Sequence, residues 1–292
     1  MTLNGKLDIM MIGHFAKDKL VVDDKTEFAS GGAVYYGSVV ANKLGAKVGV
    51  VTRLHPDDFF RLDELKSQGI ELFPVSAQAT SGIENRYNSA DMERRICKLM
   101  SFAGSFQPAD IPDTPARIYA IVPIIAGEVD LPTLKMLAQR GAVALDIQGF
   151  VRVPNGGELV FRQWDAMAEG LKHVTYLKVD RAEAELLTGL TDLQEAARRL
   201  AEYGPQEVVV TQSAGVTVYA DGKIYQAPFT PRSLAGRTGR GDTCFAAYLS
   251  QRLTKSPAEA TRWAGAVTTL KQEKPGPWRG SIADALALVN HS

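Results

Sequence analysis

The strongest constraint on the fold is an alternation of short apolar runs with amphipathic segments along most of the 292 residues. Leu7 to Ile12 is an apolar run that ends at Gly13, as buried strands commonly do. Ala33 to Leu44 has apolar residues at helical spacing and stops at Gly45. Further strands are expected at 46–52, 70–75, 118–122, 142–147, 175–179 and 207–211, and further helices at 58–68, 131–139, 161–172, 181–187 and 193–203. This order predicts an α/β fold in which a parallel sheet is covered on both faces.

Two segments depart from the alternation and are more polar than the expected core strands. Phe15 to Ser30 is expected to be extended around a turn at Asp23-Asp24, and Ser81 to Ser101 to form a hairpin. We expect these segments to build a small accessory sheet, separate from the main one. Because the chain contains no repeat and no linker-like stretch, residues 1–292 are expected to form a single domain.

Composition excludes several classes of function. Lys+Arg and Asp+Glu each number 33, so the formal net charge is zero and no nucleic-acid or acidic-membrane partner is expected. No apolar run approaches the ~18 residues of a membrane span, and the first residues contain too short an apolar run for a signal peptide. The two cysteines, Cys97 and Cys244, have the spacing of neither a disulfide framework nor a zinc site. We therefore expect a soluble cytoplasmic protein.

The stretch R-T-G-R-G-D-T-C, from Arg237 to Cys244, carries the clearest chemical signal. Apolar residues follow it at helical spacing, so it is expected at a helix N-terminus, where amides and the helix dipole bind anions. Gly239 and Gly241 permit close approach of a phosphate, and Asp242 can accept a proton from an attacking hydroxyl. Two other interpretations remain open for the motif alone. Asp242 can be a simple helix cap, and Arg240-Gly241-Asp242 can be an adhesion signal.

Other polar residues are expected near the carboxyl ends of strands, where ligands of open α/β sheets gather. Gly31-Gly32 opens a helix, and Asp18 follows the first strand. Asp146, Gln148 and Arg152 follow a later strand and supply the mixture of acceptors and donors that suits a polyol. Each of these residues, taken alone, can equally be a surface or capping residue. The four histidines show no metal-ligand spacing.

Together these motifs resemble the ribokinase-like (PfkB) family of carbohydrate kinases, in order and over nearly the whole chain. Gly31-Gly32 through Leu44-Gly45 resembles the first family signature, and Arg237 to Asp242 resembles the second, T-G-x-G-D. Asp180-Arg181-Ala182-Glu183 is similar to the Asn-x-x-Glu motif of the family. Val208 to Thr211 with Gly215-Val216 resembles the strand and loop beside the nucleotide.

The resemblance implies an ATP- and Mg²⁺-dependent kinase with a Rossmann-like three-layer α/β/α core and a small β-sheet lid from about 15–30 and 81–101. Asp242 would be the catalytic base, and Gly239, Arg240 and Gly241 would form the anion hole. The residues expected at the donor are Asp180, Glu183, Thr211, Gly215 and Thr238, with Asp180 and Glu183 also at the metal. The residues expected at the substrate are Asp18, Gly31, Gly32, Arg86, Asp146, Gln148 and Arg152. Arg86 can instead be a solvated charge on the lid.

The chain departs from the family pattern at four positions. Arg240 replaces a small residue, and Asp180 replaces Asn. Gly236 replaces an acidic residue, which puts potassium activation in doubt. Tyr36 replaces a sugar-binding Asn, which disfavours ribose.

The run Asp146 to Arg152 resembles the version in myo-inositol kinases, so myo-inositol is the expected substrate. A nucleoside or furanose kinase and a catalytically inactive ligand sensor remain as alternatives. The resemblance also allows a homodimer through the lid, which the sequence does not decide.

Overall fold

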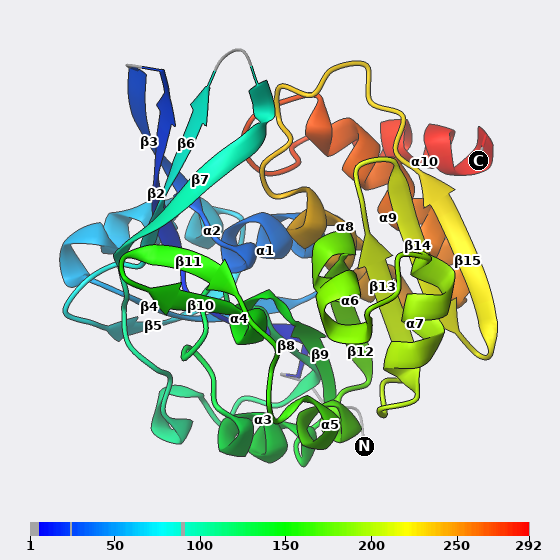
Figure 1. Cartoon of the computed structure of the whole chain (residues 1–292), viewed down its shortest axis with the longest axis horizontal. Helices are drawn as coiled ribbons and strands as arrows, with labels where there is room; N and C mark the ends of the chain where they lie inside the picture. The colour runs from blue at the N-terminus through cyan, green and yellow to red at the C-terminus, as the bar shows by residue number, and fades with distance from the viewer. Residues whose placement is uncertain (1–5, 24, 89–90, 292) are drawn as a thin grey trace.

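The fold consists of two β-sheets and the helices that cover the larger one (Figure 1). The computed structural model describes residues 6–23, 25–88 and 91–291. The larger sheet has nine strands in the order β15-β14-β13-β12-β9-β8-β1-β4-β5. Its strands are β1 (Leu7–Ile12), β4 (Val48–Leu54), β5 (Glu71–Ser76), β8 (Ala116–Ile121), β9 (Ala142–Asp146), β12 (Tyr176–Asp180), β13 (Glu207–Thr211), β14 (Gly215–Ala220) and β15 (Lys223–Pro228).

Seven neighbouring strands of the larger sheet, from β13 to β5, run parallel, and β14 and β15 are added antiparallel at one edge. The central strand β1 pairs with β4 and β8, with Ile9 opposite both Val48 and Ile118. Parallel strands joined through helices present all their carboxyl ends at one edge of the sheet. That edge holds the residues described in the next section.

Helices cover both faces of this sheet because alternate residues of each strand point to opposite sides. Met11 and Val209 belong to one buried cluster, with residues of α1, α8, α9 and α10. Met10 and Val210 belong to the other, with residues of α3, α5, α6 and α7. The helices are α1 (Ala33–Lys43), α3 (Leu131–Ala138), α5 (Met167–Gly170), α6 (Arg181–Thr188), α7 (Leu193–Ala201), α8 (Arg240–Arg252), α9 (Pro257–Gln272) and α10 (Ile282–His291). The α/β fold predicted from the alternation is confirmed.

The second sheet consists of three antiparallel strand pairs side by side, in the order β10-β11-β7-β6-β2-β3. Figure 1 shows its strands β2, β3, β6 and β7 rising above α1 at upper left. Two of its pairs coincide with the polar segments singled out in the sequence. The strands are β2 (Ala16–Val22), β3 (Lys25–Gly31), β6 (Gly82–Asn88), β7 (Asp91–Ser101), β10 (Arg152–Asn155) and β11 (Glu158–Phe161).

Two expected helices differ from those observed. The helix expected at 161–172 is wrong at its start, because Phe161 ends β11 and regular helix is limited to Met167–Gly170 and the 3₁₀ turn Leu171–His173. The helix expected at 58–68 is instead the 3₁₀ helix Pro56–Leu62 followed by α2 (Asp63–Ser67). The short elements α4 (Gln148–Val151) and the 3₁₀ turn Pro108–Asp110 complete the chain. None of the described helices is both long and apolar enough to cross a membrane.

A buried histidine joins the larger sheet to the second sheet. His14 follows β1, and its Nε2 lies 2.9 Å from the Gly104 carbonyl oxygen while its Nδ1 lies 2.7 Å from Ser81 Oγ. Since a carbonyl can only accept, Nε2 carries the proton and Nδ1 accepts from the serine hydroxyl. Ser81 Oγ also accepts from the Ala103 amide at 2.9 Å. Burial lowers the pKa of His14 to about 3, so the imidazole is neutral at physiological pH.

We expect Ser81→Ala to lower the free energy of unfolding by about 1–3 kcal/mol, because it leaves the His14 ring nitrogen and the Ala103 amide buried without a partner. The matched control is Ser67→Ala, since Ser67 Oγ donates to the Glu64 carbonyl at an exposed position. Urea unfolding of both variants checks the expectation. Equal losses in the two variants would contradict the role assigned to this junction.

Candidate active site

The loop before α8 has the shape of an anion site because its glycines allow close packing. Gly239 is the N-cap of α8 with φ 79°, in the left-handed region that favours glycine. A Cβ at Gly239 would lie 2.4 Å from a ring carbon of Tyr36 on α1. The loop is therefore pressed against α1, and the chain turns directly from it into the helix.

The first turn of α8 offers amide groups to a ligand. The Thr243 amide donates to the Gly239 carbonyl oxygen at 3.0 Å and begins the helical pattern. The amides of Gly241 and Asp242 precede it and have no carbonyl of their own helix to bond. Together with the helix dipole, they form a suitable environment for phosphate oxygens.

Asp242 lies in this first turn and lines the cavity described below, and the surroundings of its carboxyl group shift its pKa. Burial and, to a smaller extent, the nearby carboxylate of Asp146 raise the pKa of Asp242 to about 6, against the lowering effects of Lys178 and Lys271. A carboxyl with a pKa just below neutrality is ionised at pH 7 and still accepts a proton. Asp242 thus has the acid–base character that a general base requires.

A buried lysine lies below the loop, on the strand β12. Lys178 Nζ donates to Asp146 Oδ1 at 3.1 Å and lies 3.8 Å from Glu183 Oε2. Burial alone would lower the pKa of Lys178, but these two carboxylates, together with Asp180 and Asp242, outweigh it and raise the pKa above its ordinary value. A Cβ at Gly241 would lie 3.3 Å from Lys178 Cε. A permanent positive charge therefore lies directly beneath the anion loop.

Asp180 and Glu183 form a reciprocal cap at the start of α6. The Glu183 amide donates to Asp180 Oδ1 at 2.8 Å, and the Asp180 amide donates to Glu183 Oε2 at 2.7 Å. Glu183 Oε1 is buried and has no hydrogen-bond partner among the described residues.

This orphaned oxygen, with the Asp180 carboxylate beside the cavity, fits the way Mg²⁺ is held by one or two carboxylates and substrate phosphates. Among the described residues, no group of three or more His, Cys, Asp or Glu is arranged to hold a metal ion alone. A site that takes only two protein carboxylates does not require such a group.

The opposite end of the site is built partly by the second sheet. Asp18 lies in β2 opposite Ala29, and its Oδ1 accepts from the Ile83 amide at 3.0 Å. Gly31 leaves space for this carboxylate, since a Cβ there would lie 2.5 Å from Asp18 Oδ2. Arg152 donates to Gln148 Oε1 at 3.1 Å. This end therefore offers a carboxylate, an amide and a guanidinium.

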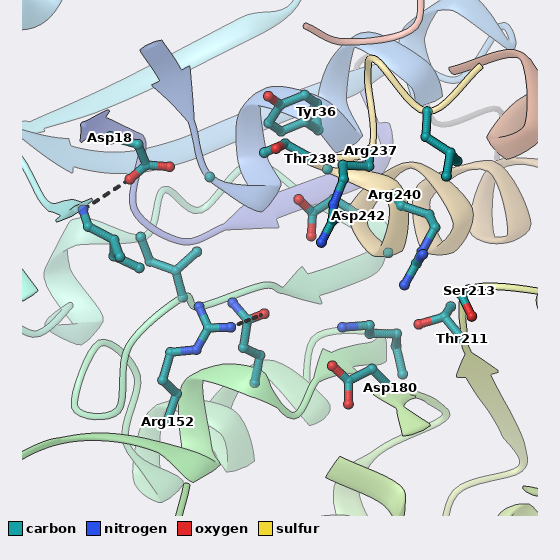
Figure 2. Close-up of a pocket in the computed structure, with 18 residues that line it drawn as sticks. Asp18, Tyr36, Arg152, Asp180, Thr211, Ser213, Arg237, Thr238, Arg240 and Asp242 are labelled. Atoms are coloured by element: carbon teal, nitrogen blue, oxygen red, sulfur yellow. Dashed lines mark hydrogen bonds between the residues drawn. The ribbon is translucent and has the colours of Figure 1, made fainter. Parts of the chain in front are cut away.

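These groups surround one cavity of about 420 Å³. Figure 2 shows Asp242 between Asp18 and Arg152 on one side and Arg240, Thr211 and Ser213 on the other. Its lining comprises Asp18, Gly32, Tyr36, Ile83, Ile124, Gln148, Arg152, Lys178, Asp180, Thr211, Ser213, Leu234, Arg237, Thr238, Gly239, Arg240, Gly241 and Asp242. The side with Asp18 and Arg152 is called the acceptor end below, and the side with Arg240 and Thr211 the donor end.

The structure brings most of the expected site residues to this cavity. The expected residues that line it are Asp18, Gly32, Gln148, Arg152, Asp180, Thr211, Thr238, Gly239, Arg240, Gly241 and Asp242. Four expected residues lie outside the lining: Gly31 beneath Asp18, Asp146 bonded to Lys178, Glu183 behind Asp180, and Gly215 at the start of β14 opposite Pro228. Arg86 belongs to β6, and its side chain lies outside the part of the chain that is described.

Two lysines near the loop were missed by sequence reasoning. Lys178 lies between the buried apolar residues Leu177 and Val179 of β12, and a charge at such a position indicates a buried ion pair. Lys271, in the last turn of α9, donates to the carbonyl oxygens of Gly236 and Thr238. It belongs to no motif and could be found only from the folded chain.

Comparison with known proteins identifies the family of this chain. Residues 1–281 match the family described as pfkB family carbohydrate kinase. A cytidine kinase of Thermococcus kodakarensis is 27% identical over 263 residues, which cover 87% of this chain and 91% of the relative.

Two solved structures resemble the whole chain. A pyrophosphate-dependent kinase of the ribokinase family, complexed with a pyrophosphate analogue and myo-inositol, is 38% identical with a TM-score of 0.89, over 96% of this chain and 99% of the other. A pyrophosphate-dependent myo-inositol-1 kinase converted into a myo-inositol-3 kinase is 36% identical with a TM-score of 0.88, over 97% and 98%. With the family match extending over residues 1–281, this chain belongs to the pfkB family of carbohydrate kinases.

Proposed function

We propose that this kinase transfers a phosphoryl group from pyrophosphate to a hydroxyl of a cyclic polyol, with myo-inositol as the substrate. The observation that carries the proposal is the position of Asp242 between the acceptor end and the cationic donor end of one cavity (Figure 2). Two solved relatives at 36–38% identity, both pyrophosphate-dependent and both described with myo-inositol, support it.

Pyrophosphate replaces the ATP that the family resemblance implied. Arg237, Arg240 and Lys178 line the cavity around the loop, which suits a compact and highly charged donor. Thr211 at the end of β13 and Ser213 in the turn after it add two hydroxyls. Pyrophosphate has no nucleoside, so its affinity depends on such charge-assisted contacts. ATP remains the alternative donor, because a more distant neighbour of the same fold is complexed with ATP and Mg²⁺.

The acceptor end suits a ring that carries many hydroxyls. Asp18 and Gln148 can accept hydrogen bonds, and Arg152 can donate them. Ile83 and Ile124 also line the cavity and offer apolar surface to the C–H groups of a ring. A nucleoside is the second candidate acceptor, favoured by the cytidine kinase relative.

In the proposed step, Asp242 removes the proton from the attacking hydroxyl. The hydroxyl oxygen forms a bond to the nearer phosphorus, the bridging P–O bond breaks, and orthophosphate leaves with the electron pair. The amides of Gly241 and Asp242 and the Lys178 ammonium stabilise the charge that develops on the transferred group. When bound, Mg²⁺ neutralises phosphate oxygens, and Asp180 and Glu183 are the residues that would hold it.

We also propose that the second sheet acts as a lid over the acceptor end, since Asp18 and Ile83 come from it. Binding of myo-inositol is expected to slow hydrogen exchange of the β2 amides, because the ligand would hold Asp18 in place. Mass spectrometry with and without myo-inositol measures this exchange, and the β14 amides of the larger sheet serve as the internal control. Unchanged exchange in β2 at saturating ligand would contradict the lid.

A panel of donors and acceptors tests the proposed reaction. Purified enzyme is expected to convert myo-inositol with pyrophosphate and Mg²⁺ at a higher kcat/KM than ribose or cytidine, and to prefer pyrophosphate to ATP. Arg240→Met is expected to raise the KM for pyrophosphate about tenfold or more, since a charge-assisted contact is lost. Arg199→Met, at an exposed position on α7, is the matched control. If the enzyme converted only cytidine, and only with ATP, both the proposed donor, pyrophosphate, and the proposed acceptor, myo-inositol, would be overturned.

Asp242→Asn is expected to lower kcat by about 10²–10⁴, the usual contribution of general acid–base catalysis. The matched control is Asp192→Asn, because Asp192 caps α7 by accepting from the Gln194 and Glu195 amides and Asn caps equally well. Wild-type kcat/KM is expected to rise through pH 6 as Asp242 loses its proton. If residual activity of the variant keeps the same pH dependence, the ionisation belongs to another group and Asp242 is not the base.

A further inference from the structure

A buried lysine supports the anion loop from behind. Lys271, in the last turn of α9, is 1% exposed, and its Nζ donates to the carbonyl oxygens of Gly236 and Thr238. The Nζ also lies 5.1 Å from the centre of the Tyr36 ring, a distance at which the ring face attracts a cation. It does not line the cavity, so it lies on the side of the loop away from a ligand.

In the part of the chain that the structure describes, the charge of Lys271 has no direct carboxylate partner. Among the described residues, no carboxylate oxygen forms an ion pair with its Nζ, although Asp242 is close enough to act on it electrostatically. Burial lowers the pKa of Lys271 to about 8, and Asp242 opposes that shift. A buried charge without an ion-pair partner lowers stability more often than it raises it. Its presence therefore points to a role in the site.

The contacts of Lys271 determine which way the loop amides point. In a planar trans peptide the carbonyl and the following N–H point in opposite directions. Because the Thr238 carbonyl oxygen is bonded to Nζ, the amide of Gly239 points away from Lys271. Gly239 lines the cavity on that other side. The Lys271 ammonium group thus orients the Gly239 amide toward the donor end of the cavity.

Close packing adds to this anchoring. The Gly236 amide donates to the Gln272 carbonyl oxygen at 2.8 Å. A Cβ at Gly236 would lie 1.8 Å from the Lys274 carbonyl oxygen. The start of the loop is therefore seated on the C-terminal end of α9, and Lys271 is the cation at this contact.

We propose that Lys271 is a built-in cation that holds residues 236–239 in the donor-binding conformation, in the way a bound monovalent cation coordinated by carbonyl oxygens would. It is a positioning residue, because it acts through the loop and touches neither substrate. The inference rests on the proposed role of this loop in binding the donor phosphates. It does not depend on which donor or polyol the enzyme uses.

The test removes the ammonium group of Lys271 by substitution and then supplies an ammonium or methylammonium ion in solution. Lys271→Ala leaves a space beside two carbonyl oxygens, whereas Lys271→Met fills that space without charge. The control is Thr261→Val, a buried substitution at the other end of α9, where Thr261 Oγ1 donates to the Pro257 carbonyl. Each variant is assayed with the donor and acceptor that the wild type turns over best, with and without ammonium or methylammonium chloride. Pyrophosphate binding is measured by calorimetry, and folding by circular dichroism.

We expect both Lys271 variants to lose about 100-fold in kcat, the cost of misplacing a catalytic group by about an ångström, with the acceptor KM unchanged. Methylammonium is expected to restore about tenfold in Lys271→Ala, as one charge-assisted hydrogen bond would, and nothing in Lys271→Met. Thr261→Val should keep wild-type kinetics.

Wild-type kcat in Lys271→Met would overturn the inference, as would equal rescue of both variants. Unfolding of both variants without recovery in methylammonium would also overturn it, because Lys271 would then maintain the fold instead of the loop. If the wild type uses ATP and not pyrophosphate, the proposed donor fails while the Lys271 test proceeds with ATP.

Discussion

The start of α8 is the constraint on which the rest of the site depends. In the proposed site, one turn of chain presents free amides, admits a phosphate and carries a carboxylate. A Cβ at position 239 would lie 2.4 Å from the Tyr36 ring, so glycine is needed there, and a Cβ at position 241 would lie 3.3 Å from Lys178 Cε, a tight contact. The amides attract negative charge, whereas Asp242 brings negative charge of its own. The buried cations Lys178 and Lys271 favour the ionised form of Asp242, because each of them lowers its pKa. Burial and the carboxylate of Asp146 raise that pKa. The raising contributions prevail, so the pKa of Asp242 is about 6, above that of an ordinary aspartate.

Much of the fold was predictable because its signals are local. The core strands are apolar runs ended by glycine, and the helices between them show helical spacing, so the layered α/β arrangement followed from the order of elements. The pair β10 and β11 was missed although Gly156-Gly157, the two-residue turn between them, is a strong hairpin signal. Phe161, which ends β11, was instead assigned to a helix over 161–172, whereas the helix begins only at Met167. Here a short turn motif was the better guide than periodicity.

Those residues of the candidate site that belong to sequence motifs could be predicted from the sequence. The glycine loop, Asp18 and the run from Gln148 to Arg152 meet at one cavity, as their positions at strand ends implied. Lys178 could have been suspected from its place in an apolar strand. The position of Lys271 could not, since it lies about thirty residues beyond the loop and meets it only because α9 packs against α8. Contacts of this kind depend on tertiary packing and leave no pattern in the local sequence.

The second sheet has a consequence for how the chain folds. Its three strand pairs leave the larger sheet at three separate points, after β1, after β5 and after β9, and return to pair with one another. The contacts between pairs therefore join residues far apart in sequence, such as Glu158 and Lys98. Closing such loops costs entropy that is recovered only when the strands are already held near each other. The second sheet should thus assemble after the nine-stranded core, so that the acceptor end of the cavity becomes the last part of the enzyme to form.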